Sequence, residues 1–105
     1  MNDPIEDVLD QLRQKAGVQR KHFSRNFLNN VGEVFEREGF ATTRLFLEDK
    51  KGRGATRDQA RVLLEEVLPV LATCERIVQN RAIGRYIIKA LPTLQDKKIR
   101  KGGKR

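Results

Sequence analysis

Hydrophobic residues recur at helical spacing from the start of the chain. The apolar positions of the first segment are three or four residues apart: Ile5, Val8, Leu9 and Leu12. This spacing places them on one face of a helix. Asp3 followed by Pro4 is typical of a helix start, because the aspartate caps free backbone N–H groups and proline suits the first turn. We expect this helix to end at Gly17.

A second amphipathic segment is rich in phenylalanine. Its apolar residues share one helical face: Phe23, Phe27, Val31, Val34 and Phe35. The pattern predicts a helix from about Gln19 to Glu38, with Gly39 as its C-terminal stop.

Residues 40–51 give an ambiguous pattern. Three consecutive apolar residues, Leu45 to Leu47, suit a buried strand as well as a short helix that begins near Thr42 or Thr43. We favour the helix. The following loop, residues 50–54, is basic and contains two glycines, so we expect it to be exposed.

A central helix is predicted to follow this loop. Thr56 and Gln59 have the spacing of a capping box, in which each side chain accepts a hydrogen bond from the backbone N–H of the other residue. The next residues are apolar around much of the helix circumference, which is typical of a buried helix. Pro69 removes one backbone hydrogen bond, so we expect a kink or a restart there before the helix continues toward Asn80.

The last predicted helix, residues 81–91, has two distinct faces. Ile83, Ile87 and Leu91 form an apolar face, while the basic residues lie at four-residue steps on another: Arg81, Arg85 and Lys89. We expect the helix to stop at Pro92. Beyond Gln95 the chain has almost nothing to bury, which predicts a flexible basic tail.

These elements predict an all-α fold, a compact bundle of four to five helices with a flexible basic C-terminal tail. A chain of 105 residues has room for one domain. We place the helical domain at residues 1–94 and the basic tail at residues 95–105.

The formal net charge of +8 is unevenly distributed along the chain. From Arg76 to Arg105 there are ten basic residues and one acid, whereas residues 1–75 hold 12 basic and 13 acidic residues. A nearly neutral body followed by a cationic segment indicates a polyanionic partner.

The residues that could carry catalysis or hold a metal are few. A catalytic pair of His22 and Cys74 would require the two to meet in space, and we interpret Cys74 as a buried apolar residue instead. One histidine and one cysteine are too few for a structural zinc site. Glu65 and Glu66 are interpreted as part of a solvated helix face or a helix end. We therefore expect no enzyme activity and no cofactor.

The leading functional hypothesis is a small regulatory or accessory protein that binds DNA or structured RNA, mainly through phosphate contacts. An alternative for the helical row is pairing with acids of the first helix, such as Asp7 or Asp10. The candidate nucleic-acid-binding residues are Lys51, Arg53, Arg76, Arg81, Arg85, Lys89, Lys97, Lys98, Arg100, Lys101, Lys104 and Arg105.

A second hypothesis is a protein-interaction adaptor or inhibitor with a solubilising tail. Its acidic first helix or its phenylalanine-rich second helix would dock the partner, and it predicts an exposed apolar patch. A homodimer is compatible with both hypotheses, because a chain this small can complete its core across a two-fold axis. The sequence has no apolar run long enough for a membrane span, which favours a cytoplasmic or nuclear protein with no membrane partner.

Overall fold

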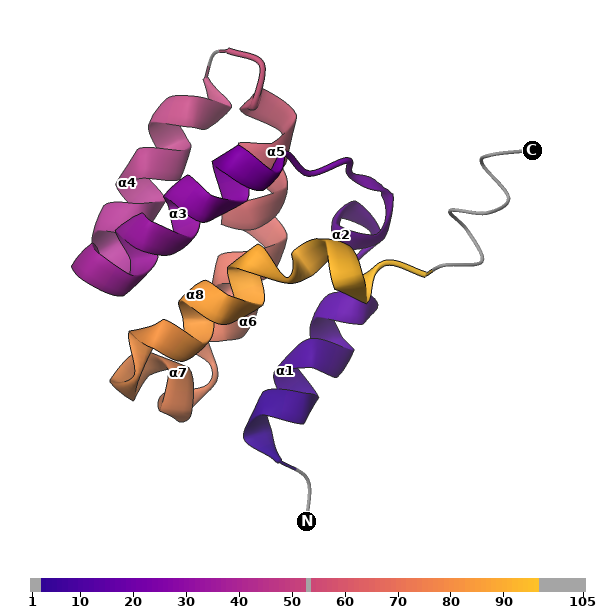
Figure 1. Ribbon diagram of the computed structural model, residues 1–105, viewed down its shortest axis with the longest axis vertical. Coiled ribbons are helices and arrows are strands. Elements are labelled where there is room, and N and C mark those ends of the chain that lie inside the picture. The colour runs from indigo at the N-terminus through magenta and orange to yellow at the C-terminus, as the bar shows by residue number, and fades with distance from the viewer. Residues whose placement is uncertain (1–2, 53, 97–105) are drawn as a thin grey trace.

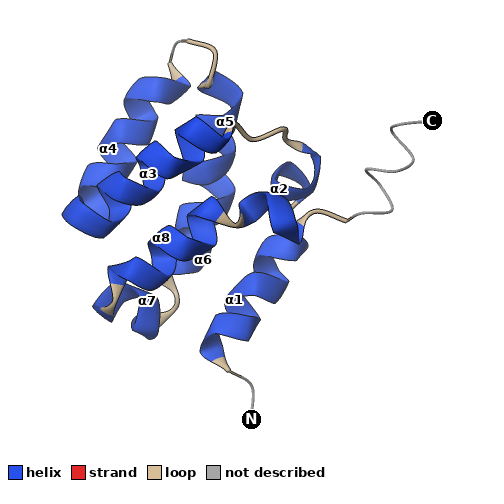
Figure 2. Ribbon diagram, viewed as in Figure 1, coloured by secondary structure: helices blue, strands red, loops and turns tan. Residues whose placement is uncertain are grey.

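A computed structural model describes residues 3–52 and 54–96, and these residues form helices and no strand (Figures 1 and 2). The predicted all-α class is confirmed, with more helical segments than the four to five expected. The predicted flexible tail falls, from residue 97 onward, outside the described residues. No helix in the described part of the chain has the length and apolar character needed to cross a membrane.

The first predicted helix is divided in two. Helix α1, Pro4–Arg13, begins as expected, with the Asp3 carboxylate accepting a hydrogen bond from the Ile5 N–H at 2.8 Å. It ends at Arg13, and Gly17 lies inside a second short helix, α2, Ala16–Arg20. The prediction that Gly17 ends the first helix is therefore wrong.

A contact with a distant residue explains the glycine at position 17. The Gly17 N–H donates a hydrogen bond to Glu66 Oε1 at 2.9 Å, and a Cβ at this position would lie 2.5 Å from Glu66 Oε2. With glycine at this position the carboxylate can approach the backbone this closely, and a side chain here would displace it. Glu66 thus caps α2, which corrects its interpretation as part of a solvated face.

The predicted helix from Gln19 to Glu38 is interrupted at residues 21–24, which include Phe23. Helix α3, Arg25–Glu38, starts after Ser24, whose hydroxyl accepts a hydrogen bond from the Phe27 N–H at 3.3 Å. Its end is as predicted, because Gly39 has a φ of +93°, which a residue with a side chain rarely adopts.

Residues 40–51 are helical, which settles the ambiguity between strand and helix. Helix α4, Phe40–Lys51, follows Gly39 directly. Leu47 is fully buried, and the Phe40 ring packs edge-on against Phe35 with 4.7 Å between the ring centroids. Leu45 points outward and is 70% exposed, so the apolar run does not form a buried strand.

The central helix is built from four segments. These are α5 (Arg57–Val62), the π-helical turn η1 (Leu63–Val67), α6 (Leu68–Ala72) and α7 (Glu75–Gln79). The Thr56 side chain makes no cap, so the predicted capping box is wrong; the Gln59 side chain instead accepts a hydrogen bond from the Ser24 N–H at 2.8 Å.

Pro69 interrupts the central helix less than expected. It lies in the first turn of α6, where its missing N–H matters least. The irregularity is the wider π turn just before it, in which the Leu68 N–H bonds to the Leu63 carbonyl. The actual break comes later, at Thr73 and Cys74, before α7.

Helix α8, Arg81–Lys89, is followed by a 3₁₀ turn, η2, Leu91–Leu94, which contains Pro92. It packs closely along α3 (Figure 1). Gly84 makes this approach possible, because a Cβ there would lie 2.2 Å from Phe35 Cε2. The core is therefore centred between α3, α8 and the central segments, with Phe35, Leu63 and Ile88 almost fully buried.

Candidate nucleic-acid interface

The predicted basic row of α8 lies beside α3. Arg81 Nη1 lies over Gly39, where an added Cβ would be 2.6 Å away. The stems of Arg85 and Lys89 pass Gly32, with their Cγ atoms 3.1 and 3.6 Å from the position of a Cβ on that glycine. Gly32 within α3 and Gly39 at the end of this helix thus leave room for the long cationic side chains of α8.

Arg85, the central residue of the row, is paired with an acid. Its Nη1 donates a hydrogen bond to Glu36 Oε1 of α3 at 2.6 Å. This hydrogen bond is the main cause that raises the pKa of the Arg85 guanidinium; desolvation opposes it, and the charges of Glu36 and Glu33 add to the increase. Both side chains remain more than one-third exposed. The centre of the row is therefore locally neutralised.

The sequence suggested, as an alternative, that the basic row pairs with acids of the first helix. The acid that pairs with Arg85 belongs to α3 instead. Asp10 of α1 instead pairs with Arg13 on its own helix at 2.8 Å. Within the described part of the chain, Arg81 and Lys89 form no ion pair and are both exposed. Two of the three cations in the row are thus available to an external anion.

Two other candidate residues lie in surface ion pairs. Arg76 of α7 is 3.7 Å from Asp3, and Lys51 of α4 is 3.2 Å from Glu48. Exposed pairs of this kind are weak and readily exchanged for solvent or a stronger anion. The structure brings neither residue into the row on α8.

The remaining candidates lie outside the described residues: Arg53, Lys97, Lys98, Arg100, Lys101, Lys104 and Arg105. The number of these basic residues determines how the net charge is distributed along the chain. Residues 3–52 and 54–96 hold fifteen basic and fourteen acidic residues, so they are almost neutral. Six cations and no acid follow Asp96.

Two glutamines hold the last described residues, 94–96, against the helical body. Gln19 Nε2 donates to the Leu94 carbonyl at 2.8 Å, and Gln19 Oε1 accepts from the Asp96 N–H at 2.7 Å. Gln95 Nε2 donates to the Lys21 carbonyl at 2.7 Å and to the Val18 carbonyl at 3.1 Å. Sequence reasoning missed this clamp, because isolated glutamines carry no local signal of their distant partners.

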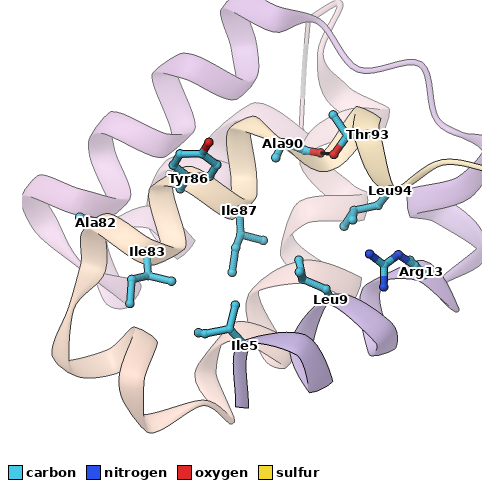
Figure 3. Close-up of a pocket in the computed structure, with 10 residues that line it drawn as sticks. All are labelled: Ile5, Leu9, Arg13, Ala82, Ile83, Tyr86, Ile87, Ala90, Thr93 and Leu94. Carbon is cyan, nitrogen blue, oxygen red and sulfur yellow. Dashed lines mark hydrogen bonds between the residues drawn. The ribbon is translucent and has the colours of Figure 1, made fainter. Parts of the chain in front are cut away.

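An apolar groove of about 570 Å³ opens between α1, α8 and η2 (Figure 3). Ile5 and Leu9 project from α1 toward Ile83 and Ile87 of α8, and Tyr86 stands at the α8 edge. The hydrophobic pattern assigned these helix faces to the core. It could not indicate that α8 packs mainly on α3 and leaves its other apolar side open toward α1.

The two residues considered for catalysis differ in their exposure to solvent. Cys74 is a free thiol with 5% of its surface exposed, whereas His22 is exposed in the segment before α3. Among the described residues, no group of three or more histidine, cysteine or acidic side chains is placed to hold a metal ion.

Comparison with models of protein families, with characterised proteins and with solved structures gives no match.

Proposed function

We propose that this protein binds the phosphate backbone of DNA or structured RNA, without catalysis, through the cationic residues that follow Asp96. The observation that carries the proposal is the separation of charge. The described helical body is nearly neutral, and six cations follow Asp96, whose backbone N–H is held by the Gln19 side chain. A polyanion is the partner best suited to such a segment, since each phosphate contact releases a condensed counterion.

Arg81 and Lys89 are proposed as secondary contacts. Both are exposed on α8, and neither is neutralised by an ion pair among the described residues. Arg85 contributes less, because Glu36 already accepts its hydrogen bond. A duplex or a folded RNA is favoured over an unpaired strand, because aromatic residues make up 6% of the chain and stacking of single bases needs more of them.

The test compares the full chain with a chain that ends at Asp96. Fluorescence anisotropy with a labelled DNA duplex and a labelled RNA hairpin would be measured at several salt concentrations. If the six terminal cations contact phosphates, their removal lowers the magnitude of the log–log salt slope by about 5 for duplex DNA. Equal slopes for both chains, or no binding by the full chain at low salt, would contradict the proposal.

A pair of matched variants tests the secondary contacts. Arg81→Gln with Lys89→Gln removes two exposed cations from α8, and Arg44→Gln with Arg61→Gln removes two exposed cations from other helices. We expect the first variant to bind more weakly than the second. Equal binding by both would show that net charge alone matters and that α8 contributes no specific contact.

A protein-interaction module is the second candidate function, and the apolar groove favours it. The phenylalanine-rich α3 is a poor docking element, because Phe27 and Phe35 are buried in the core. The acidic α1, which forms one wall of the groove, is the better one. Failure of the full chain to bind either nucleic acid at low salt would favour this function over the first.

A further inference from the structure

Two long stretches of the chain contain no acidic residue. Residues 11–32 hold five lysines and arginines and the only histidine, and residues 76–95 hold four lysines and arginines. The structure brings these stretches together: α2 contacts η2, and the Gln95 side chain donates hydrogen bonds to the carbonyls of Val18 and Lys21 (Figure 1). Helix α3, which begins in the first stretch, packs along α8 of the second. The fold therefore joins two parts of the chain that carry only positive charge.

The relative direction of α3 and α8 determines which cations are neighbours. Arg81 Nη1 lies over Gly39, the residue that ends α3. The Lys89 stem lies over Gly32, two turns earlier in α3, so the two helices run antiparallel. Arg25 is seven residues before Gly32, on the same face of α3 and about 10 Å farther along its axis. Arg25 therefore follows Lys89 along one face of α3.

The short segment between α2 and α3 is fixed at both ends. The Lys21 carbonyl accepts a hydrogen bond of 2.7 Å from Gln95 Nε2, and the Ser24 N–H donates one of 2.8 Å to a glutamine of α5. Phe23 is buried and anchors the segment in the core, whereas His22 next to it is exposed. The imidazole is thus presented on a backbone that loses little conformational entropy when a ligand binds.

The arginines on either side of this segment are free of acidic partners. Arg20 and Arg25 are exposed, and neither forms an ion pair with any acid among residues 3–52 and 54–96. Lys21 differs, because it lies 3.9 Å from Asp58. Arg25 is the first residue of α3, where a cation is electrostatically unfavourable, so folding gains nothing from its charge. The charges of both arginines are therefore available to a ligand.

The row of available cations is bounded by an acid at each end. At the α8 end, Glu36 accepts the hydrogen bond of Arg85. At the α2 end, the Gln19 side chain holds the N–H of Asp96, the last acid before the six terminal cations. The row therefore comprises only the cations that lie between these two acids.

We propose that Arg20, His22 and Arg25, continued by Lys89, form a strip on the helical body that contacts phosphates of the bound nucleic acid. All four side chains are exposed and can donate hydrogen bonds. A row of donors spread over two turns of α3 and the adjoining segment suits a strand of regularly spaced phosphates better than a single small anion. The inference rests on the proposed function, and it extends the contact from α8 to the segment between α2 and α3.

The full chain with a DNA duplex tests the inference at a single side chain. His22 is the only histidine, so its imidazole C–H signals in an NMR spectrum report on this strip. We expect these signals to move when duplex is added at a concentration where fluorescence anisotropy shows binding. Unchanged His22 signals in the bound protein would overturn the inference and leave the proposed function intact. No binding by the full chain at low salt would overturn both.

Matched double variants of the full chain test the two arginines. Arg20→Gln with Arg25→Gln removes two cations of the strip, and Arg37→Gln with Arg44→Gln removes two exposed cations near the opposite end of α3. We expect the first variant to lower the magnitude of the log–log salt slope on duplex DNA by about two, and the second to leave it nearly unchanged. Circular dichroism would establish that both variants are folded. Equal slopes for the two variants would overturn the inference.

Discussion

Arg85 of α8 and Glu36 of α3 are joined by a hydrogen bond of 2.6 Å between Nη1 and Oε1. The pair links the two described helices with the most extensive mutual contact, and it places a negative charge in the middle of the basic row. The same acid that orients Arg85 therefore also reduces the attraction of the row for an external anion.

Removal of this charge is predicted to strengthen nucleic-acid binding. Glu36→Gln keeps an oxygen that can accept a hydrogen bond from Arg85 but leaves the guanidinium charge uncompensated. We expect tighter binding and a salt slope steeper by about one unit on duplex DNA, as one more cation becomes available for a phosphate. Anisotropy titrations at several salt concentrations would measure both.

Glu65→Gln is the control for this variant. It makes the same change in net charge at an exposed acid on the η1 turn. If both variants gain the same affinity, the position of Glu36 has no special effect and only the net charge of the protein is important.

Local signals were sufficient to predict several helix ends. Asp3 and Pro4 start α1, and Gly39 ends α3, because each acts on backbone groups within a few residues of itself. The errors have a common physical cause. Gly17 and Gln59 have their partners 49 and 35 residues away, in Glu66 and Ser24, so their roles depend on tertiary contacts that no local pattern contains.

The candidate site was predictable to a similar extent. Helical spacing correctly predicted that Arg81, Arg85 and Lys89 occur on one helix, side by side. It did not predict that the row lies along α3, where Glu36 reaches Arg85. Nor did it predict the groove, because an apolar face looks the same in sequence whether a neighbouring helix covers it or not.

Close packing of α3 and α8 predicts a large effect of a small substitution. In Gly84→Ala, the added methyl group would lie 2.2 Å from Phe35 Cε2, and Phe35 is fully buried, so neither residue can move freely. We expect the free energy of unfolding to fall by about 1–3 kcal/mol. Urea denaturation would measure it.

Gly52→Ala is the matched control for this substitution. Gly52 is exposed at the end of α4 in a right-handed conformation, and a Cβ there meets nothing closer than 3.6 Å. Its effect should stay within about 0.5 kcal/mol. A loss as large as that of Gly84→Ala would contradict the prediction, because Gly52 has no comparable contact and the change from glycine to alanine by itself favours folding by lowering the entropy of the unfolded chain.

The cap that Glu66 provides to α2 leads to a third prediction. Glu66→Ala leaves the Gly17 N–H without its 2.9 Å acceptor, and we expect a loss of about 1 kcal/mol in the free energy of unfolding. Glu65→Ala, at the exposed neighbouring position, should cost less than about 0.5 kcal/mol. Equal losses in urea denaturation would mean that the hydrogen bond to Gly17 contributes no net stability.

The glutamine clamp predicts that the stability of the helical body depends on residues just beyond η2. Gln95→Ala removes two hydrogen bonds, to the carbonyls of Val18 and Lys21, and should lower the free energy of unfolding by about 1–2 kcal/mol. Gln79→Ala, which removes one exposed hydrogen bond within α7, should cost less than about 0.5 kcal/mol.

The same clamp determines where the chain can be shortened without damage to the fold. A chain that ends at Leu94 lacks Gln95 and the Asp96 N–H that bonds to Gln19, whereas a chain that ends at Asp96 retains both. Thermal unfolding should therefore give a lower midpoint for the first chain, and a midpoint close to that of the full chain for the second. If both shortened chains unfold at the same temperature, the clamp does not stabilise the body, and weaker nucleic-acid binding by either one can be attributed to lost charge alone.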